Sequence, residues 1–97
     1  MTTGTAFEVS DDVVWAGDDT VRLYNVNTGQ FQSLNGSASQ IWCLMAAGRD
    51  PGQIADELAA KLAGGDPLAR AEILSDVHDF LGGMAAKEMV IPQRGQP

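Results

Sequence analysis

The sequence predicts an α+β fold, a winged helix-turn-helix in which an N-terminal three-stranded antiparallel sheet is followed by three helices. The spacing of apolar residues changes from a period of two before Asn35 to about 3.6 after it. Two later segments start with an aspartate followed by proline, which is typical of helix N-termini. With 97 residues, 44% of them hydrophobic, the chain suits a single domain. We expect that domain over residues 6–91, with flexible ends at 1–5 and 92–97.

The first third of the chain predicts short strands, because its apolar runs are rich in β-branched and aromatic residues. Asn27, Thr28 and Gly29 form a turn signal in which Gly29 supplies the left-handed residue that a hairpin needs. Two tight connections in succession imply a three-stranded meander whose last strand is an edge, and a free edge accepts another chain. The runs are residues 7–9, 13–15, 20–26 and 30–34.

The first helix is predicted to start at Ser37 and to end near Gly48. Ser37 with Gln40 three residues later resembles a capping box, in which side chains satisfy the free amides of the first turn. The apolar stripe of this helix consists of Ala38, Ile41, Trp42 and Met45.

Residues typical of helix N-termini predict two further helices. Asp50 precedes Pro51, and Gln53 occupies the capping-box position, so a second helix should run from here to the glycine pair at 64–65. Asp66 starts a third helix that should run to about Lys87. Its apolar residues cover a broad surface, and glycines at 82 and 83 should weaken its end by roughly 1 kcal/mol each. Residues 89–91 predict a short final strand.

Charge excludes several classes of partner. Thirteen acidic and six basic residues give a formal net charge of −7, with no basic cluster, and the exposed positions of the third helix include Glu72, Asp76, His78 and Asp79. Nucleic-acid binding depends on neutralising phosphates, so we expect no nucleic-acid partner. There is no secretory signal and no apolar run of about 20 residues, so no membrane partner is expected. With one cysteine, a cytoplasmic location is the natural expectation.

The sequence also lacks the residues that catalysis and metal binding require. Cys43 is the only cysteine and His78 the only histidine, and they fall on different predicted helices. We interpret Cys43 as a buried, inert thiol and His78 as a solvated or capping residue. No zinc or calcium ligand spacing and no phosphate-binding glycine loop is present. We therefore predict no catalytic residue, no metal and no cofactor.

What remains is a surface for another chain. An extended peptide could add to the strand at residues 30–34 and lie in a groove against the broad apolar side of the third helix. Alternatively, Phe31 and Leu34 belong to the core, while Val77 and Phe80 only pack on the sheet. Composition alone favours this second interpretation.

Four segments together resemble the PqqD family. They are residues 28–35 (TGQFQSLN), 41–42 (IW), 54–58 (IADEL) and 75–81 (SDVHDFL), and the similarity extends over residues 9–91. The resemblance implies a domain of three strands and three helices that recognises precursors of ribosomally synthesised, post-translationally modified peptides. It also implies that a leader peptide lies antiparallel to the third strand and against the third helix. By matching position, the peptide-binding residues would be Phe31, Gln32, Ser33, Leu34, Ile73, Asp76, Val77, Phe80 and Met84.

The resemblance further implies a partner enzyme. Because the similar region occupies nearly the whole chain, we expect it to act in trans, delivering the leader peptide to a separate leader peptidase or other modifying enzyme. A lasso-peptide pathway is slightly favoured over a radical-SAM enzyme of the kind served in pyrroloquinoline quinone formation. Two other hypotheses stay open: an acidic winged-helix regulator that binds proteins, and a homodimerisation module that pairs through the same free strand edge.

Overall fold

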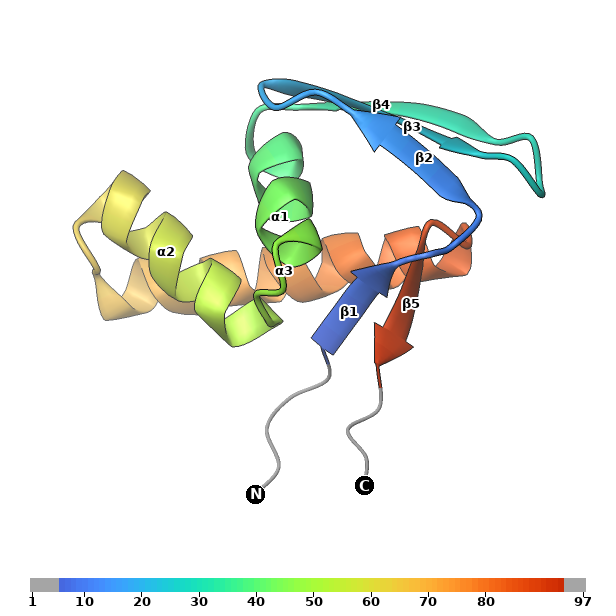
Figure 1. Ribbon diagram of the computed structural model, residues 1–97. Helices are drawn as coiled ribbons and strands as arrows, with labels where there is room; N and C mark the ends of the chain where they lie inside the picture. The colour runs from blue at the N-terminus through green and yellow to red at the C-terminus, as the bar shows by residue number, and fades with distance from the viewer. Residues whose placement is uncertain (1–5, 94–97) are drawn as a thin grey trace.

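The computed structural model describes residues 6–93 and is a mixed α+β fold (Figure 1). The predicted α+β class and the three helices are confirmed. In chain order the elements are β1 (Ala6–Val9), β2 (Val13–Ala16), β3 (Thr20–Asn25), β4 (Phe31–Asn35), α1 (Ser37–Ala46), α2 (Pro51–Ala63), α3 (Pro67–Ala86) and β5 (Val90–Gln93).

The strands form two antiparallel sheets. One has the order β2-β3-β4 and the other pairs β1 with β5 (Figure 1). The prediction that the chain begins with the three-stranded sheet is therefore wrong, because the first strand pairs with the last. The ladder between β1 and β5 joins Ala6 to Gln93 and Val9 to Val90, residues far apart in the sequence. No pattern among neighbouring residues in the sequence indicates that β1 pairs with β5.

Asn25 holds the turn between β3 and β4 and ties it to the other end of the chain. Gly29 has φ 79°, which confirms the left-handed residue predicted at this turn. The side-chain oxygen Oδ1 of Asn25 accepts from the amides of Asn27 and Thr28 at 2.8 and 3.0 Å. Its Nδ2 donates to the backbone carbonyl of Glu88 at 2.9 Å. One buried side chain thus connects the hairpin to the turn after α3.

The start of α1 differs from the prediction. Its N-cap is Gly36, with φ 59°, and no side chain caps the helix, so the capping box expected at Ser37 and Gln40 is wrong. Ser39 instead anchors the helix to the sheet. Its buried hydroxyl accepts from the amide of Val21 at 3.2 Å and donates to the carbonyl of Leu34 at 2.8 Å. The hydroxyl therefore completes the ladder between β3 and β4.

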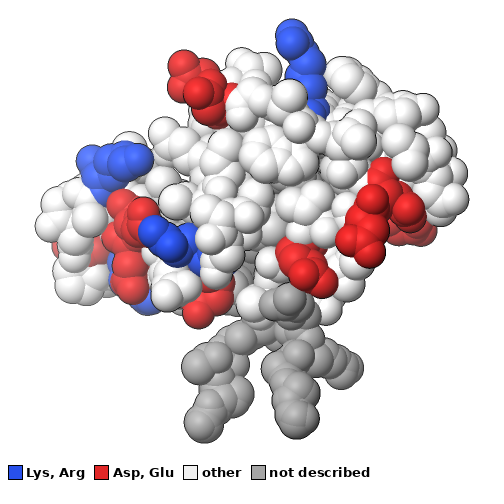
Figure 2. Space-filling view, in the orientation of Figure 1, with Lys and Arg blue, Asp and Glu red and all other residues white. Residues whose placement is uncertain are grey.

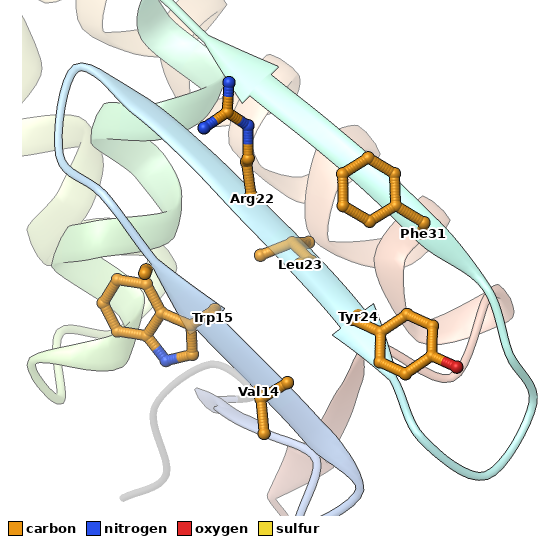
Figure 3. A pocket seen from close by; sticks show the side chains of 7 residues that line it. Val14, Trp15, Arg22, Leu23, Tyr24 and Phe31 are labelled. Carbon is orange, nitrogen blue, oxygen red and sulfur yellow. The ribbon is translucent and has the colours of Figure 1, made fainter.

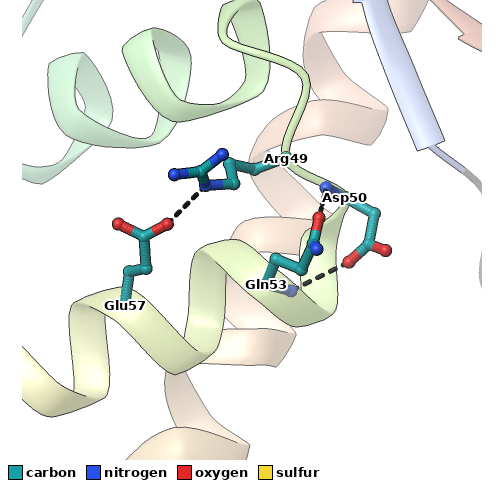
Figure 4. Close-up of polar contacts among 4 residues, drawn as sticks. All are labelled: Arg49, Asp50, Gln53 and Glu57. Carbon is teal, nitrogen blue, oxygen red and sulfur yellow. Dashed lines mark hydrogen bonds and ion pairs between the residues drawn. The ribbon is translucent and has the colours of Figure 1, made fainter.

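The starts of α2 and α3 follow the prediction. Asp50 accepts from the amide of Gln53 at 2.8 Å, and the side chain of Gln53 accepts from the amide of Asp50 at 3.0 Å, which is a complete capping box (Figure 4). Arg49, just before this cap, pairs with Glu57, about two turns into α2 (Figure 4). Asp66 caps α3 by accepting from the amide of Ala69 at 3.1 Å.

The end of the chain is more regular than expected. Helix α3 continues through Gly82 and Gly83 to Ala86, so the glycines do not end it early. The final strand runs to Gln93, past the domain boundary expected at Ile91. The remaining parts of the predicted flexible ends, residues 1–5 and 94–97, lie outside the described residues.

All three helices and both sheets contribute to one hydrophobic core. Trp42 of α1 is fully buried at its centre and meets Trp15 of β2 edge to face, with ring centroids 6.0 Å apart. The other fully buried large apolar side chains are Val21, Leu23, Met45, Ile54, Leu58, Val77, Leu81 and Met89. No helix within residues 6–93 is long and apolar enough to span a membrane.

Candidate functional site

Strand β4 is an edge of its sheet: among residues 6–93 it pairs with β3 alone. The amide of Asn25 donates to the carbonyl oxygen of Gln30 at 2.9 Å, and such bonded pairs alternate along an antiparallel ladder. The backbone groups of Gln32 therefore point toward β3. Those of Phe31 and Ser33 point away from the sheet and form what we call the β4 edge. These are the groups that an added strand would pair with.

The side chains of β4 alternate between the two faces of the sheet. Leu34 is 4% exposed and belongs to the core, whereas Phe31 is 60% exposed on the opposite face. Gln32 is half-buried on the core side, and Ser33 is exposed. Phe31 and Leu34 therefore point to opposite faces, as their separation of three positions requires without a bulge.

One side of helix α3 forms a partly exposed stripe. Ile73, Asp76, Phe80, Gly83 and Lys87 follow one another at spacings of three or four residues, so they lie on one side of the helix. We call these five residues the α3 stripe. Its two large apolar side chains, Ile73 and Phe80, are half-buried, and Asp76 is exposed. The stripe thus combines an apolar surface with two charges.

One contact links the end of the α3 stripe to β4. The ammonium nitrogen Nζ of Lys87, at the end of α3, donates to the side-chain oxygen Oε1 of Gln32 at 3.3 Å. In Figure 1, β4 runs toward α1, while α3 runs the other way, toward β5. Strand and helix are therefore antiparallel, with the start of β4 beside the end of α3.

Sequence reasoning had not placed Lys87 at the site. The sequence feature that could have indicated it is the spacing of seven residues between Phe80 and Lys87, which is about two helical turns and places both on one side of the helix.

The nine predicted peptide-binding residues differ in accessibility. Phe31, Gln32 and Ser33 on β4, and Ile73, Asp76 and Phe80 on α3, are exposed or half-buried. Leu34, Val77 and Met84 are buried, with exposed fractions of 4%, 0% and 3%, so these three lie behind the surface rather than on it. Their role in binding, like that of the other six, stays a prediction.

The outer face of the three-stranded sheet, opposite the core, carries a shallow apolar pocket (Figure 3). Val14, Tyr24 and Phe31 are direct cross-strand neighbours and form an exposed row across all three strands. Phe31 therefore belongs to two surfaces. Its backbone lies on the β4 edge, while its side chain lines this pocket. A strand added to the β4 edge would extend the outer face beside Phe31.

Cys43 on α1 carries a half-buried free thiol. Burial, with a smaller contribution from the Asp18 carboxylate, raises the pKa of the Cys43 thiol above its ordinary value. A raised pKa disfavours the nucleophilic thiolate. No metal-binding group of three or more His, Cys, Asp or Glu side chains occurs in the part of the chain that the structure describes.

On the face seen in Figure 2, Lys and Arg lie mainly over the α2 end, mixed with Asp and Glu, and the centre is uncharged.

An accessible strand edge beside a helix is an arrangement to which an extended peptide can add as a further strand. Residues 21–90 match the family described as coenzyme PQQ synthesis protein D (PqqD). The chain therefore belongs to the PqqD family, as its sequence segments indicated. No curated protein matches the chain.

Two solved structures resemble the whole domain. The first, described as TbiB1 in complex with the TbiA(beta) leader peptide, is 34% identical and has a TM-score of 0.79. The match covers 91% of this chain and 99% of that one. The second, a lasso peptide synthetase B1 complexed with the leader peptide, is 18% identical with a TM-score of 0.73. It covers 89% of this chain and 98% of that one, and at this identity it supports the fold alone.

Proposed function

We propose that this protein binds the leader peptide of a ribosomally synthesised precursor, without catalysing a reaction itself. The leader would add to the β4 edge as a fourth, antiparallel strand and rest its alternate side chains on the α3 stripe. Under this proposal the fold is a winged helix-turn-helix in which the sheet edge, instead of a DNA-reading helix, makes the contact. We place the complex in the cytoplasm, without metal or cofactor.

The observation that carries this proposal is the position of an open strand edge beside a partly apolar helix face. Backbone groups of Phe31 and Ser33 face away from β3, and the hydrogen bond from Lys87 to Gln32 links the end of α3 to β4. Main-chain hydrogen bonds would supply affinity, and the half-buried Ile73 and Phe80 would supply apolar contact. The 34% identical TbiB1, solved with a leader peptide, adds support.

Calorimetric titration tests the proposal directly. The protein would be titrated with synthetic leader segments of the short precursor peptides encoded beside its gene. We expect one-to-one binding with a dissociation constant on the order of 1 μM or tighter. No heat with any such leader, from a folded sample, contradicts the proposal.

A backbone substitution on β4 tests strand addition itself. Ser33→Pro removes an amide that points to the open edge, so it should weaken leader binding while leaving the ladder to β3 in place. Ser33→Ala is the matched control, because it removes the hydroxyl and keeps the amide. Circular dichroism should show unchanged helical content in both. Equal affinity of a folded Ser33→Pro variant and the parent would rule out strand addition at this position.

Delivery to an enzyme is the second half of the proposal. A bound leader raises the local concentration of the precursor at any enzyme that also contacts this domain, and it fixes the register of the chain. We favour a leader peptidase of a lasso-peptide pathway, with a radical-SAM enzyme as the alternative. The initial rate of leader cleavage by the peptidase encoded nearby should increase when this protein is added. Ser33→Pro should not produce that increase.

The exposed edge would also permit self-association through β4. A homodimerisation module would show a size that depends on protein concentration and is unaffected by leader. A leader-binding protein should instead be monomeric, or become monomeric, when the leader occupies the edge. Light scattering with and without leader separates the two.

A further inference from the structure

We propose that Asp76 and Lys87 select leaders by charge, reading a basic residue followed, four or six positions later, by an acidic residue. This inference rests on the proposed function and concerns the specificity of the same site. Asp76 and Lys87 are the only charged residues of the α3 stripe, and β4 contains none. Any electrostatic selectivity that the stripe and β4 impose along a bound peptide would come from these two side chains.

Both charges are available to a ligand. The two ion pairs within residues 6–93 join Arg49 to Glu57 and Arg70 to Asp56, so neither uses Asp76 or Lys87. Asp76 is exposed in the middle of α3. Within residues 6–93, the hydrogen-bond partner of the Lys87 ammonium is the neutral amide oxygen of Gln32, at 3.3 Å, and a carboxylate could take its place with a charge-assisted bond.

The order of the two charges follows from chain direction. The strand β4 and helix α3 run in opposite directions (Figure 1). A peptide antiparallel to β4 therefore runs in the same direction as α3. Its N-terminal part would pass Asp76 and its C-terminal part would pass Lys87. The basic residue must accordingly come first in the leader.

The spacing follows from the rise of helix and strand. Eleven positions separate Asp76 from Lys87 along α3, which corresponds to about 16 Å at 1.5 Å per residue. An extended peptide covers that distance in about five residues. Only alternate residues of a strand face the same side, so the two charged residues must be four or six positions apart for both to face α3.

Charge neutralisation tests the assignment. With fluorescein-labelled leaders that bind the parent protein, Asp76→Asn and Lys87→Gln should each weaken binding by about two- to fivefold at low salt. Lys61→Gln is the matched control, because it removes an exposed charge from another helix, α2, which lies away from β4, and it should change affinity by less than about twofold.

Reversing the charge on both sides identifies the partners. Asp76→Lys should weaken binding of the parent leader and regain affinity for a leader in which the facing basic residue is replaced by glutamate. Equal effects of Lys87→Gln and Lys61→Gln would overturn the assignment, as would an affinity unchanged by Asp76→Asn, or tight binding of a leader without this pair of charges. Failure of every leader to bind would overturn the proposed function, and this assignment with it.

Discussion

The hydroxyl of Ser39 donates to the carbonyl oxygen of Leu34 at 2.8 Å and so joins the first turn of α1 to the end of β4. The hydroxyl oxygen of Ser39 also accepts from the amide of Val21 at 3.2 Å. Ser39→Ala would leave two buried backbone groups without partners, so unfolding free energy should fall by about 2 kcal/mol. Chemical denaturation measures this loss. Ser37→Ala, an exposed change on the same helix, should have almost no effect, and equal losses would contradict the role of Ser39.

Asn25→Ala should destabilise the protein by about 2 to 3 kcal/mol, because it removes three side-chain hydrogen bonds at once. The exposed Asn27 is the control, since Asn27→Ala should change stability by less than about 0.5 kcal/mol. Thermal melting of both variants checks the prediction. A loss at Asn25 no larger than that at Asn27 would show that the turn does not depend on these bonds.

Two glycines should respond to alanine in opposite directions. Gly17 has φ 113°, and a Cβ there would lie 1.9 Å from the carbonyl oxygen of Thr20, so Gly17→Ala should cost more than about 2 kcal/mol. Gly82 lies within α3 with open space around it, so Gly82→Ala should stabilise by about 1 kcal/mol. Denaturation midpoints of the two variants should fall on opposite sides of the parent.

Phe80→Ala should reduce leader affinity by about tenfold or more, because this half-buried ring is the largest apolar group on the α3 stripe. Leu62→Ala is the control. It removes an exposed apolar side chain from α2, away from β4, and should leave affinity unchanged. Calorimetry on both variants, each verified as folded, measures the difference. Equal leader affinities of the two variants would contradict a contribution of α3 to the binding site.

Cys43 should react slowly with iodoacetamide near neutral pH. Burial, and then the Asp18 carboxylate, raise its pKa, so the thiolate should accumulate only at higher pH than in the unfolded chain. The folded state holds the thiol proton more tightly, and stability should therefore decrease as pH rises above the ordinary thiol value. Asp18→Asn should shift the rate profile to lower pH, but by less than unfolding does. A folded-state profile matching that of the unfolded protein would contradict this.

Local signals in the sequence predicted most of the secondary structure. Asp50 with Gln53, Asp66 and Gly29 each act within a few residues, and the structure confirms all of them. Ser37 failed as a cap because Gly36, with φ 59°, takes the N-cap position. The sheet formed by β1 and β5 could not be predicted in the same way. Its pairing is decided by tertiary packing between the two ends of the chain.

The candidate site, like the fold, could be predicted only where local sequence signals determine it. The free edge around Ser33 followed from two consecutive hairpin connections, and the structure has β4 at that edge. The burial of Val77 and Met84 depends on how α3 meets the core, so periodicity alone could not separate them from Ile73 and Phe80. Lys87 could be assigned to the candidate site only from its contact with Gln32, which the structure provides.

The pairing of β1 with β5 makes the domain amenable to circular permutation. Ala6 and Gln93 are cross-strand partners, so their Cα atoms lie about 5 Å apart and a short linker could join them. In Figure 1 the sheet of β1 and β5 lies on the opposite side of the molecule from β4. New ends opened at the exposed Gly64 and Gly65 turn would leave both sheets intact. Such a permuted domain could carry a fluorescent reporter without covering the β4 edge.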